Sequence, residues 1–269
     1  MAVITAIATW SLIAFGLLLL VAQLAAHEFG YRLGRRRAAR NDADGVGTIV
    51  SAMLALLAFV LALTLSFATN RFSERRAGSL AEANAIGTAW LRAEAIGTAA
   101  GFEIARLLEE YTKLRMAFVR SGRDPAALND IDRRTNTLQT AIWGHVAAIV
   151  REQPNPAVTS LMSAVNNTFD MTAATRFAYD YRIPSQVIWL LISMALLGMG
   201  ALGYQLGLKG GSFRVLITLL TVMWTVVIVD IFDLASPRIG TLRTSTAVYE
   251  WTLEGFKGSV PIPPSPHPQ

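Results

Sequence analysis

The chain has 269 residues, of which 53% are hydrophobic and only 16% are charged. Soluble domains carry about 25% charged residues, so this composition and the positive mean hydropathy of +0.41 disfavour a soluble globule. The net charge of +5 does not indicate a nucleic-acid partner, because the arginines gather beside apolar runs, and the absence of cysteine excludes disulfides and thiolate metal sites. The sequence therefore predicts an integral membrane protein, with the lipid bilayer as a partner.

Four stretches without charged residues predict four membrane-spanning helices. Residues 3–26, 46–70 and 183–208 are each long enough to cross a hydrocarbon core of about 30 Å as a helix. The fourth run, 215–229, is shorter, and we expect its helix to continue through Asp233 with carboxylates near one end. The first run lacks the basic residues that precede the apolar core of a signal peptide, which predicts an uncleaved anchor.

The segment between the second and third spans is predicted to be helical throughout. Apolar residues recur there at helical spacing, without strand-like alternation. Asp124-Pro125 and Asn155-Pro156 each supply an N-cap followed by proline at the first helical position, and Pro184 is predicted to start the third span in the same way. The expected helices are 71–97, which continues the second span without a break, 101–121, 125–151 and 156–182.

The fold class that follows is an all-α membrane protein with four transmembrane helices and a long helical extramembrane insert between the second and third. Prolines recur through residues 257–269, which predicts an extended tail. The predicted segments are transmembrane helices 1 and 2 with a basic loop (1–70), a helical extramembrane bundle (71–183), transmembrane helices 3 and 4 (184–236), and a C-terminal segment with the proline-rich tail (237–269).

Basic residues between the spans predict the sidedness of the protein. The two short loops lie on the same side because four spans alternate, and short loops rich in arginine and lysine prefer the cytoplasm, which predicts an external helical insert. Arg71, Arg75 and Arg76, at the other end of the second span, argue the opposite way but belong to a long segment, which counts for little in this rule. The loop residues concerned are Arg32, Arg35, Arg36, Arg37 and Arg40 in the first loop, and Lys209 and Arg214 in the second.

The second span carries a stripe of small residues on one helical face. Small side chains let helix backbones approach closely in lipid, so one interpretation is a packing seam. The other interpretation is the lining of a pore in a symmetric oligomer, where small side chains leave room and hydroxyl groups offer hydrogen bonds. The stripe consists of Ser51, Ala55, Ala58, Ala62, Ser66 and Thr69.

The fourth span ends in two carboxylates, Asp230 and Asp233, which share a helical face. A carboxylate at membrane depth costs about 2.5–3.5 kcal/mol and therefore needs a partner. The second and fourth spans run in the same direction, so Arg71, Arg75 and Arg76 are the expected partners. We interpret this intramembrane charge cluster either as a clamp between the two spans or as a cation-binding or gating site.

The third span contains the glycine pair Gly203 and Gly207, whose spacing indicates close approach of another helix. The sequence shows no glycine-rich phosphate loop, no nucleophile–base pair and no metal-ligand spacing. We therefore expect neither an enzyme nor a metal or other cofactor.

Two resemblances follow from these patterns. Residues 66–76 resemble the end of the second span in bacterial bestrophins, where a pattern matched here by Arg71, Phe72, Glu74 and Arg76 follows the helix. Residues 82–89 and 233–240 are similar to bacterial bestrophin-like membrane proteins, a family of undefined function, and this second resemblance covers nearly the whole chain.

Bestrophins are homopentameric ion channels, mostly anion-selective, whose second span lines the pore. The resemblance therefore implies a homo-oligomer that passes small anions, with the stripe and Phe59 or Phe67 as pore candidates. Bestrophins keep the helical insert in the cytoplasm, whereas the charge distribution here favours the outside, and the sequence leaves this open.

Two functions fit the sequence. The first is a homo-oligomeric, bestrophin-like ion channel, multi-pass in the bacterial inner membrane. The second is a membrane scaffold or sensor that transports nothing and whose helical insert binds a partner.

Overall fold

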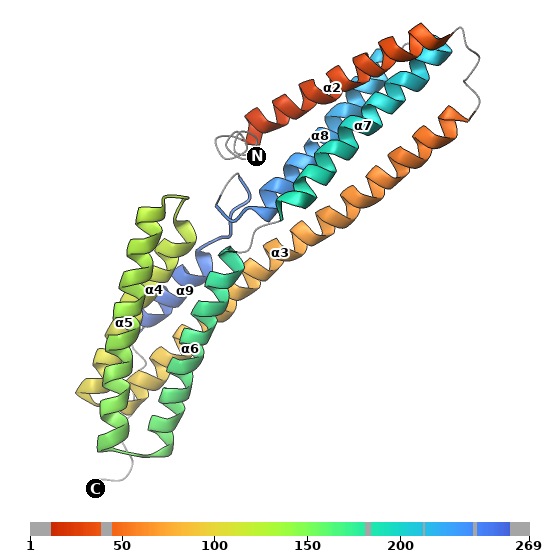
Figure 1. Cartoon of the computed structure of the whole chain (residues 1–269). Helices are drawn as coiled ribbons and strands as arrows, with labels where there is room; N and C mark the ends of the chain where they lie inside the picture. Colours follow the sequence, from red (N-terminus) through yellow and green to blue (C-terminus); the bar gives the residue numbers. More distant parts are fainter. Residues whose placement is uncertain (1–11, 39–44, 181–183, 212, 239–240, 259–269) are drawn as a thin grey trace. The chain divides into compact units, whose positions relative to one another are not determined.

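The structure, a computed structural model, describes residues 12–38, 45–180, 184–211, 213–238 and 241–258. Within these ranges every regular element is a helix, as predicted (Figure 1). The helices are α2 (Leu12–Arg37), α3 (Val46–Ile96), α4 (Ala99–Arg120), α5 (Pro125–Glu152), α6 (Pro156–Asp180), α7 (Ser185–Lys209), α8 (Arg214–Ala235) and α9 (Ala247–Lys257).

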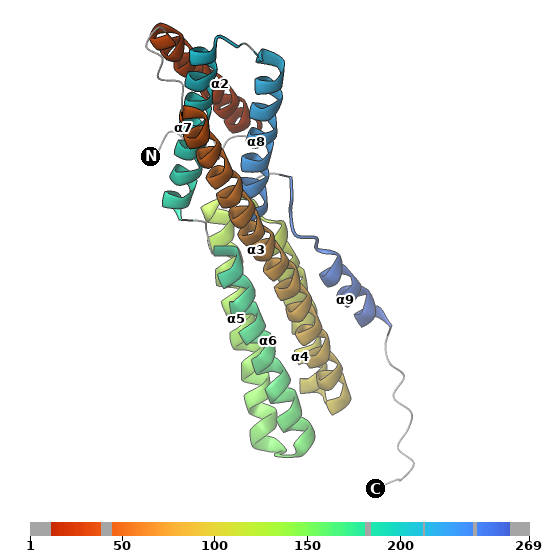
Figure 2. The ribbon, with the colours of Figure 1, turned by 90° about the vertical axis from the view of Figure 1, so that its right-hand side faces the viewer.

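The chain divides into two compact units. The first unit joins Met1–Phe72 to Arg182–Leu242, and the second joins Ser73–Tyr181 to Arg243–Gln269. Helix α3 begins in the first unit and ends in the second, so the second span and the first helix of the following segment form one continuous helix, as predicted (Figure 2).

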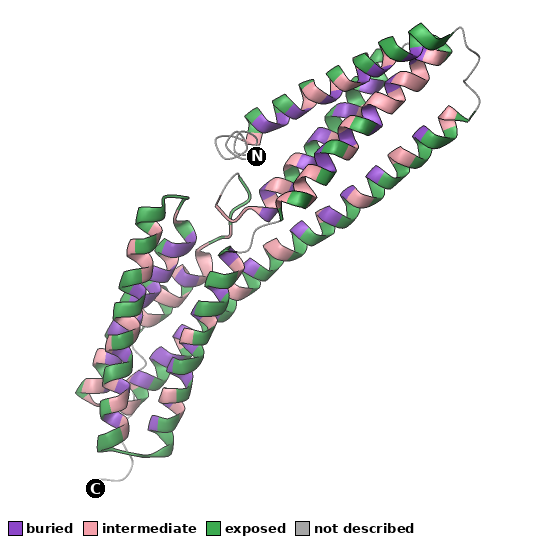
Figure 3. Cartoon of the chain, viewed as in Figure 1, coloured by how far each residue is buried: buried purple, intermediate pink, exposed green. Residues whose placement is uncertain are grey.

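Four helical stretches are long and apolar enough to cross a membrane. They are α2, α3, the stretch Pro156–Lys209 that contains α7, and α8. The chain is therefore built as a multi-pass membrane protein, and its four apolar helices contribute to one apolar core in the first unit. Figure 3 colours the buried and exposed residues along these helices. That core consists of Phe15, Leu19, Leu57, Leu61, Ala68, Leu191, Ile192, Ala195, Ile228, Ile231 and Ala235.

Helices α2 and α7 run parallel and touch backbone to backbone through glycines. A Cβ atom on Gly203 would lie 2.1 Å from the carbonyl oxygen of His27, and one on Gly30 would lie 2.0 Å from the carbonyl oxygen of Gly200. The close approach predicted from Gly203 and Gly207 is confirmed, and its partner is the similarly spaced pair Gly30 and Gly34. The carboxyl ends of α2 and α7 therefore lie together, which puts the two short loops at the same end of the first unit.

The end of α2 differs from the prediction. The first loop was expected to begin soon after residue 26, yet α2 continues to Arg37. Arg32, Arg35 and Arg36 therefore project from a helix. The reason is that arginine is a good helix former, and three arginines in the last turn oppose the negative end of the helix dipole.

The second unit contains the predicted helices within one or two residues of their expected ends. Asp124 accepts a hydrogen bond from the amide of Ala126 (3.0 Å), and Asn155 accepts one from the amide of Val158 (2.9 Å), so both predicted N-caps are confirmed. Pro184 differs slightly, since it is itself the N-cap of α7. The core side chains of this unit include Ile86, Trp90, Ile104, Leu108, Tyr111, Ile142, Leu161 and Val165.

Helix α9 lies in the segment that the sequence left without an element. Tyr249 is fully buried, and the ring of Phe256 stacks on that of Trp90 with 4.8 Å between centroids. The C-terminal segment is therefore divided: its first residues belong to the first unit, and α9 packs in the second. Most of the proline-rich tail, 259–269, lies outside the described residues.

Candidate functional site

The small-residue stripe of α3 faces away from the core of its own unit. Its six residues are exposed: Ser51, Ala55, Ala58, Ala62, Ser66 and Thr69. The buried face of the same stretch is formed by Val50, Leu57, Leu61, Thr64 and Ala68. At about 100° per residue, the stripe lies roughly 120° around the helix axis from this buried face. Within one copy, the stripe is therefore not a packing seam against any of the residues that the structure describes.

A third face of α3 carries large apolar side chains. Leu56, Leu63 and Phe67 are 55%, 48% and 59% exposed and fall within roughly 40° of one another on the helix. Phe59 is also exposed and lies between this face and the stripe. Helical geometry thus separates Phe67 from the small residues, although the resemblance grouped the two as pore candidates.

Asp233 has partners other than the predicted arginines. Its carboxylate accepts hydrogen bonds from the Thr241 amide (3.1 Å), the Thr241 hydroxyl (2.7 Å) and the Leu242 amide (3.2 Å). The side chain is 6% exposed. Asp233 therefore ties the end of α8 to the chain that follows it.

The structure does not bring the other members of the predicted charge cluster together within one unit. Asp230 is exposed, and no described residue of the first unit forms a hydrogen bond or ion pair with it. Arg71 belongs to the same unit and is half-buried, whereas Arg75 and Arg76 belong to the second unit. The clamp between the second and fourth spans stays a prediction.

The two aspartates are expected to respond differently to the same substitution. Asp233→Ala leaves three donors without their acceptor and should lower the free energy of unfolding by about 2–3 kcal/mol. Asp230→Ala, one helical turn away, should change it by less than about 0.5 kcal/mol. Thermal unfolding in detergent, followed by circular dichroism, measures both. A loss at Asp230 as large as that at Asp233 would contradict this assignment and support the clamp.

A buried polar cluster joins four helices of the second unit. The side chains of Glu82 (α3) and Arg115 (α4) are 0% and 1% exposed, and the Arg115 Nε donates to Glu82 Oε1 at 2.5 Å. The same oxygen accepts from the Thr172 hydroxyl of α6 (2.7 Å), and Oε2 accepts from the Tyr249 hydroxyl of α9 (2.6 Å). The carboxylate is thus held by three donors from three other helices.

The tyrosines of this cluster stay protonated. Burial raises the pKa of Tyr111 to about 12, and burial together with the Glu82 charge also raises the pKa of Tyr249. A raised pKa favours the folded state at pH values below the ordinary tyrosine pKa, and that stabilisation is lost as the pH rises above about 10. The hydroxyl of Tyr111 donates to Thr172 (2.7 Å) and accepts from Gln139 (2.8 Å). Both tyrosines are therefore structural donors.

Chemically, this cluster is suited to holding helices together. The Glu82 carboxylate is fully engaged, and the Arg115 guanidinium carbon lies 4.4 Å from the centre of the Phe118 ring, which adds a cation–π contact. No group of three histidine or acidic residues that could hold a metal ion exists among the described residues.

Comparisons of the chain with protein families, curated proteins and solved structures find no match.

Proposed function

We propose that the protein is a homo-oligomeric ion channel of bestrophin-like architecture in a bacterial cell membrane. Copies would meet around a shared axis lined by the small-residue stripe of α3. In this proposal Ser73–Tyr181 is an extramembrane insert, and the basic end of the first unit faces the cytoplasm.

The observation that carries the proposal is the division of α3 into three faces. One face packs in its own unit, one presents large apolar side chains suited to lipid, and the third exposes only small or hydroxylated residues. Lipid contact gives small residues no advantage, whereas close approach of another helix does. At a shared axis, the hydroxyl groups of Ser51, Ser66 and Thr69 would supply polar contacts to a passing ion.

The test uses one substitution on two faces of α3. Ala58→Leu and Ala62→Leu should each disrupt the oligomer or reduce ion flux into liposomes by about tenfold or more, because a tight shared axis cannot accept the added carbons. Ala52→Leu makes the same change at an exposed position on the large apolar side and should alter neither. Mass determination in detergent and a liposome flux assay give the two readouts. Normal assembly and normal flux in all three variants would contradict the proposal.

The second candidate is a scaffold whose insert binds a partner protein. An exposed aromatic side chain of the insert supports it, since Phe177 is 73% exposed. A wild-type protein that is monomeric and passes no ions in the assays above would favour this function over the channel.

A further inference from the structure

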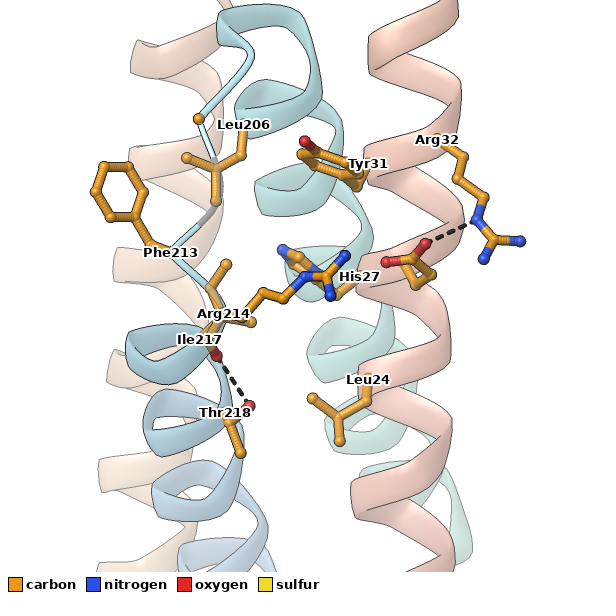
Figure 4. A pocket seen from close by; sticks show the side chains of 11 residues that line it. Leu24, His27, Tyr31, Arg32, Leu206, Phe213, Arg214, Ile217 and Thr218 are labelled. Carbon is orange, nitrogen blue, oxygen red and sulfur yellow. Dashed lines mark hydrogen bonds and ion pairs between the residues drawn. The ribbon is translucent and has the colours of Figure 1, made fainter.

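A cavity of about 430 Å³ opens in the first unit between α2, the residues that link α7 to α8, and the first turn of α8 (Figure 4). It lies at the end of the unit that carries the arginines of α2. Its volume falls in the range of about 300–1,000 Å³ found for small-ligand sites. The cavity is separate from the stripe of α3, and an inference about it does not depend on the proposed channel.

The lining changes character along the helices. Leu24 and Ile217 lie on the side nearer the middle of the spans, while Tyr31 and Arg214 lie nearer the basic end. An apolar inner part below a basic outer part matches an amphiphile whose charged group sits at the membrane surface.

The basic part has groups available to an anion. Among the described residues, the Arg214 guanidinium has no ion pair or hydrogen bond, whereas Arg32 is already paired with Glu28 at 2.7 Å. The Tyr31 hydroxyl accepts from Arg35 at 3.3 Å, which leaves its own proton free to donate. One cation and one hydroxyl donor are therefore uncommitted at the cavity.

His27 supplies the most direct sign of a missing ligand. It is 9% exposed, it lines the cavity, and its Nε2 atom has no hydrogen-bond partner among the described residues. Buried polar atoms nearly always have a partner, so an unsatisfied one on a residue that lines a cavity points to a group that binds there. In Figure 4 the side chains of His27 and Arg214 both reach into the space between α2 and α8.

The first turn of α8 contributes as well. Its N-cap is Phe213, which forms no side-chain cap hydrogen bond, so the amide groups of the first turn lack the usual acceptor. The amino end of a helix attracts negative charge, and phosphate groups are frequent occupants of such positions. Arg214, the first residue of this helix, places its positive charge at the same point.

We propose that this cavity binds the phosphate-bearing headgroup of an anionic membrane phospholipid. The phosphate accepts hydrogen bonds from Arg214, His27 and the first turn of α8, and the start of the acyl region lies against Leu24 and Ile217. The shared chemistry is phosphate recognition, and the apolar inner part favours a lipid over free phosphate.

Native mass spectrometry of the full chain in detergent, titrated with phosphatidylglycerol, tests the proposal. We expect saturable binding of phosphatidylglycerol, and little binding of phosphatidylcholine or of inorganic phosphate. Arg214→Gln should weaken phosphatidylglycerol binding by about tenfold, because a charge-assisted hydrogen bond is lost. This substitution should leave the fold intact, since the side chain is exposed and has no partner among the described residues.

Arg37→Gln is the matched control, because it removes the same charge from the same end of the unit without touching the cavity. It should leave binding nearly unchanged, whereas His27→Phe, which keeps a ring but removes Nε2, should weaken binding. Equal losses in the Arg214 and Arg37 variants would overturn the site in favour of general attraction to basic residues. Binding of inorganic phosphate as strong as that of the lipid would overturn the lipid assignment, and unchanged binding in the Arg214 variant would overturn the proposal altogether.

Discussion

Gly203→Ala should destabilise the first unit strongly, whereas Gly200→Ala, three residues earlier on the same helix, should be tolerated. A Cβ atom at position 203 would lie 2.1 Å from the carbonyl oxygen of His27 and 2.9 Å from its carbonyl carbon. Backbone atoms cannot rotate away as a side chain can, so α2 and α7 would have to move apart. A Cβ atom at position 200 would have its nearest neighbour, the carbonyl oxygen of Ala26, at 3.6 Å, an ordinary contact.

The expected loss at Gly203 is about 2–3 kcal/mol in the free energy of unfolding, the upper part of the range for overpacked sites. Gly200→Ala should be neutral or slightly stabilising, because alanine favours a helix by up to about 1 kcal/mol over glycine. Titration with sodium dodecyl sulfate in mixed micelles, followed by circular dichroism, measures both variants. Equal stability of the two would mean that α2 and α7 do not touch as described.

The helices that sequence alone predicted well are those with explicit end signals. Asp124-Pro125 and Asn155-Pro156 stop one helix and start another, and the structure contains both caps. The absence of proline through the second span predicted that it continues into the next helix, which α3 confirms. Local backbone chemistry decides these features, so they are readable without tertiary information.

Partners across the fold were harder to predict. The pair Gly203 and Gly207 indicated a close helix contact, but its partner could have been any span. Gly30 and Gly34 have the same spacing, and this feature of the sequence could have identified α2 as the partner helix. Asp233 shows the opposite difficulty, because arginines were the obvious partners by charge, whereas backbone amides eight and nine residues later hold it. Helical periodicity predicts which residues share a helix face, but it does not predict that the chain folds back onto the helix a few residues after its end.

The sequence also contained a sign of the buried ion pair in the second unit, which a search for apolar periodicity alone does not detect. Leu108, Tyr111, Arg115 and Phe118 share one face of α4, so a charge stands in an apolar row. Such a residue needs a buried acid, but the sequence does not say which of the many acids provides it. Tyr249 was missed because α9 was not predicted, and the short helix depends on packing against Trp90 through Phe256.

Glu82→Ala should cause a larger loss than Gly203→Ala. We expect it to lower the free energy of unfolding of the second unit by about 3–5 kcal/mol. It leaves Arg115 buried at 1% exposure without its counter-charge, and breaking one side of a buried pair costs that much. The hydroxyl donors of Thr172 and Tyr249 also lose their acceptor. Glu82→Gln keeps an acceptor of similar size but no charge, so we expect an intermediate loss.

A double-mutant cycle isolates the pair from the rest of the cluster. Replacing both partners, as Glu82→Leu with Arg115→Met, removes both charges at once and should cost less than the sum of the two single substitutions by more than about 1 kcal/mol. The rate of trypsin cleavage under partly denaturing conditions reports unfolding of this unit, since arginines are spread along its helices. Glu103→Ala, which breaks the exposed pair with Arg106 on α4, is the control and should leave the rate unchanged. Additive losses would instead mean that Glu82 and Arg115 stabilise the unit separately and not as a pair.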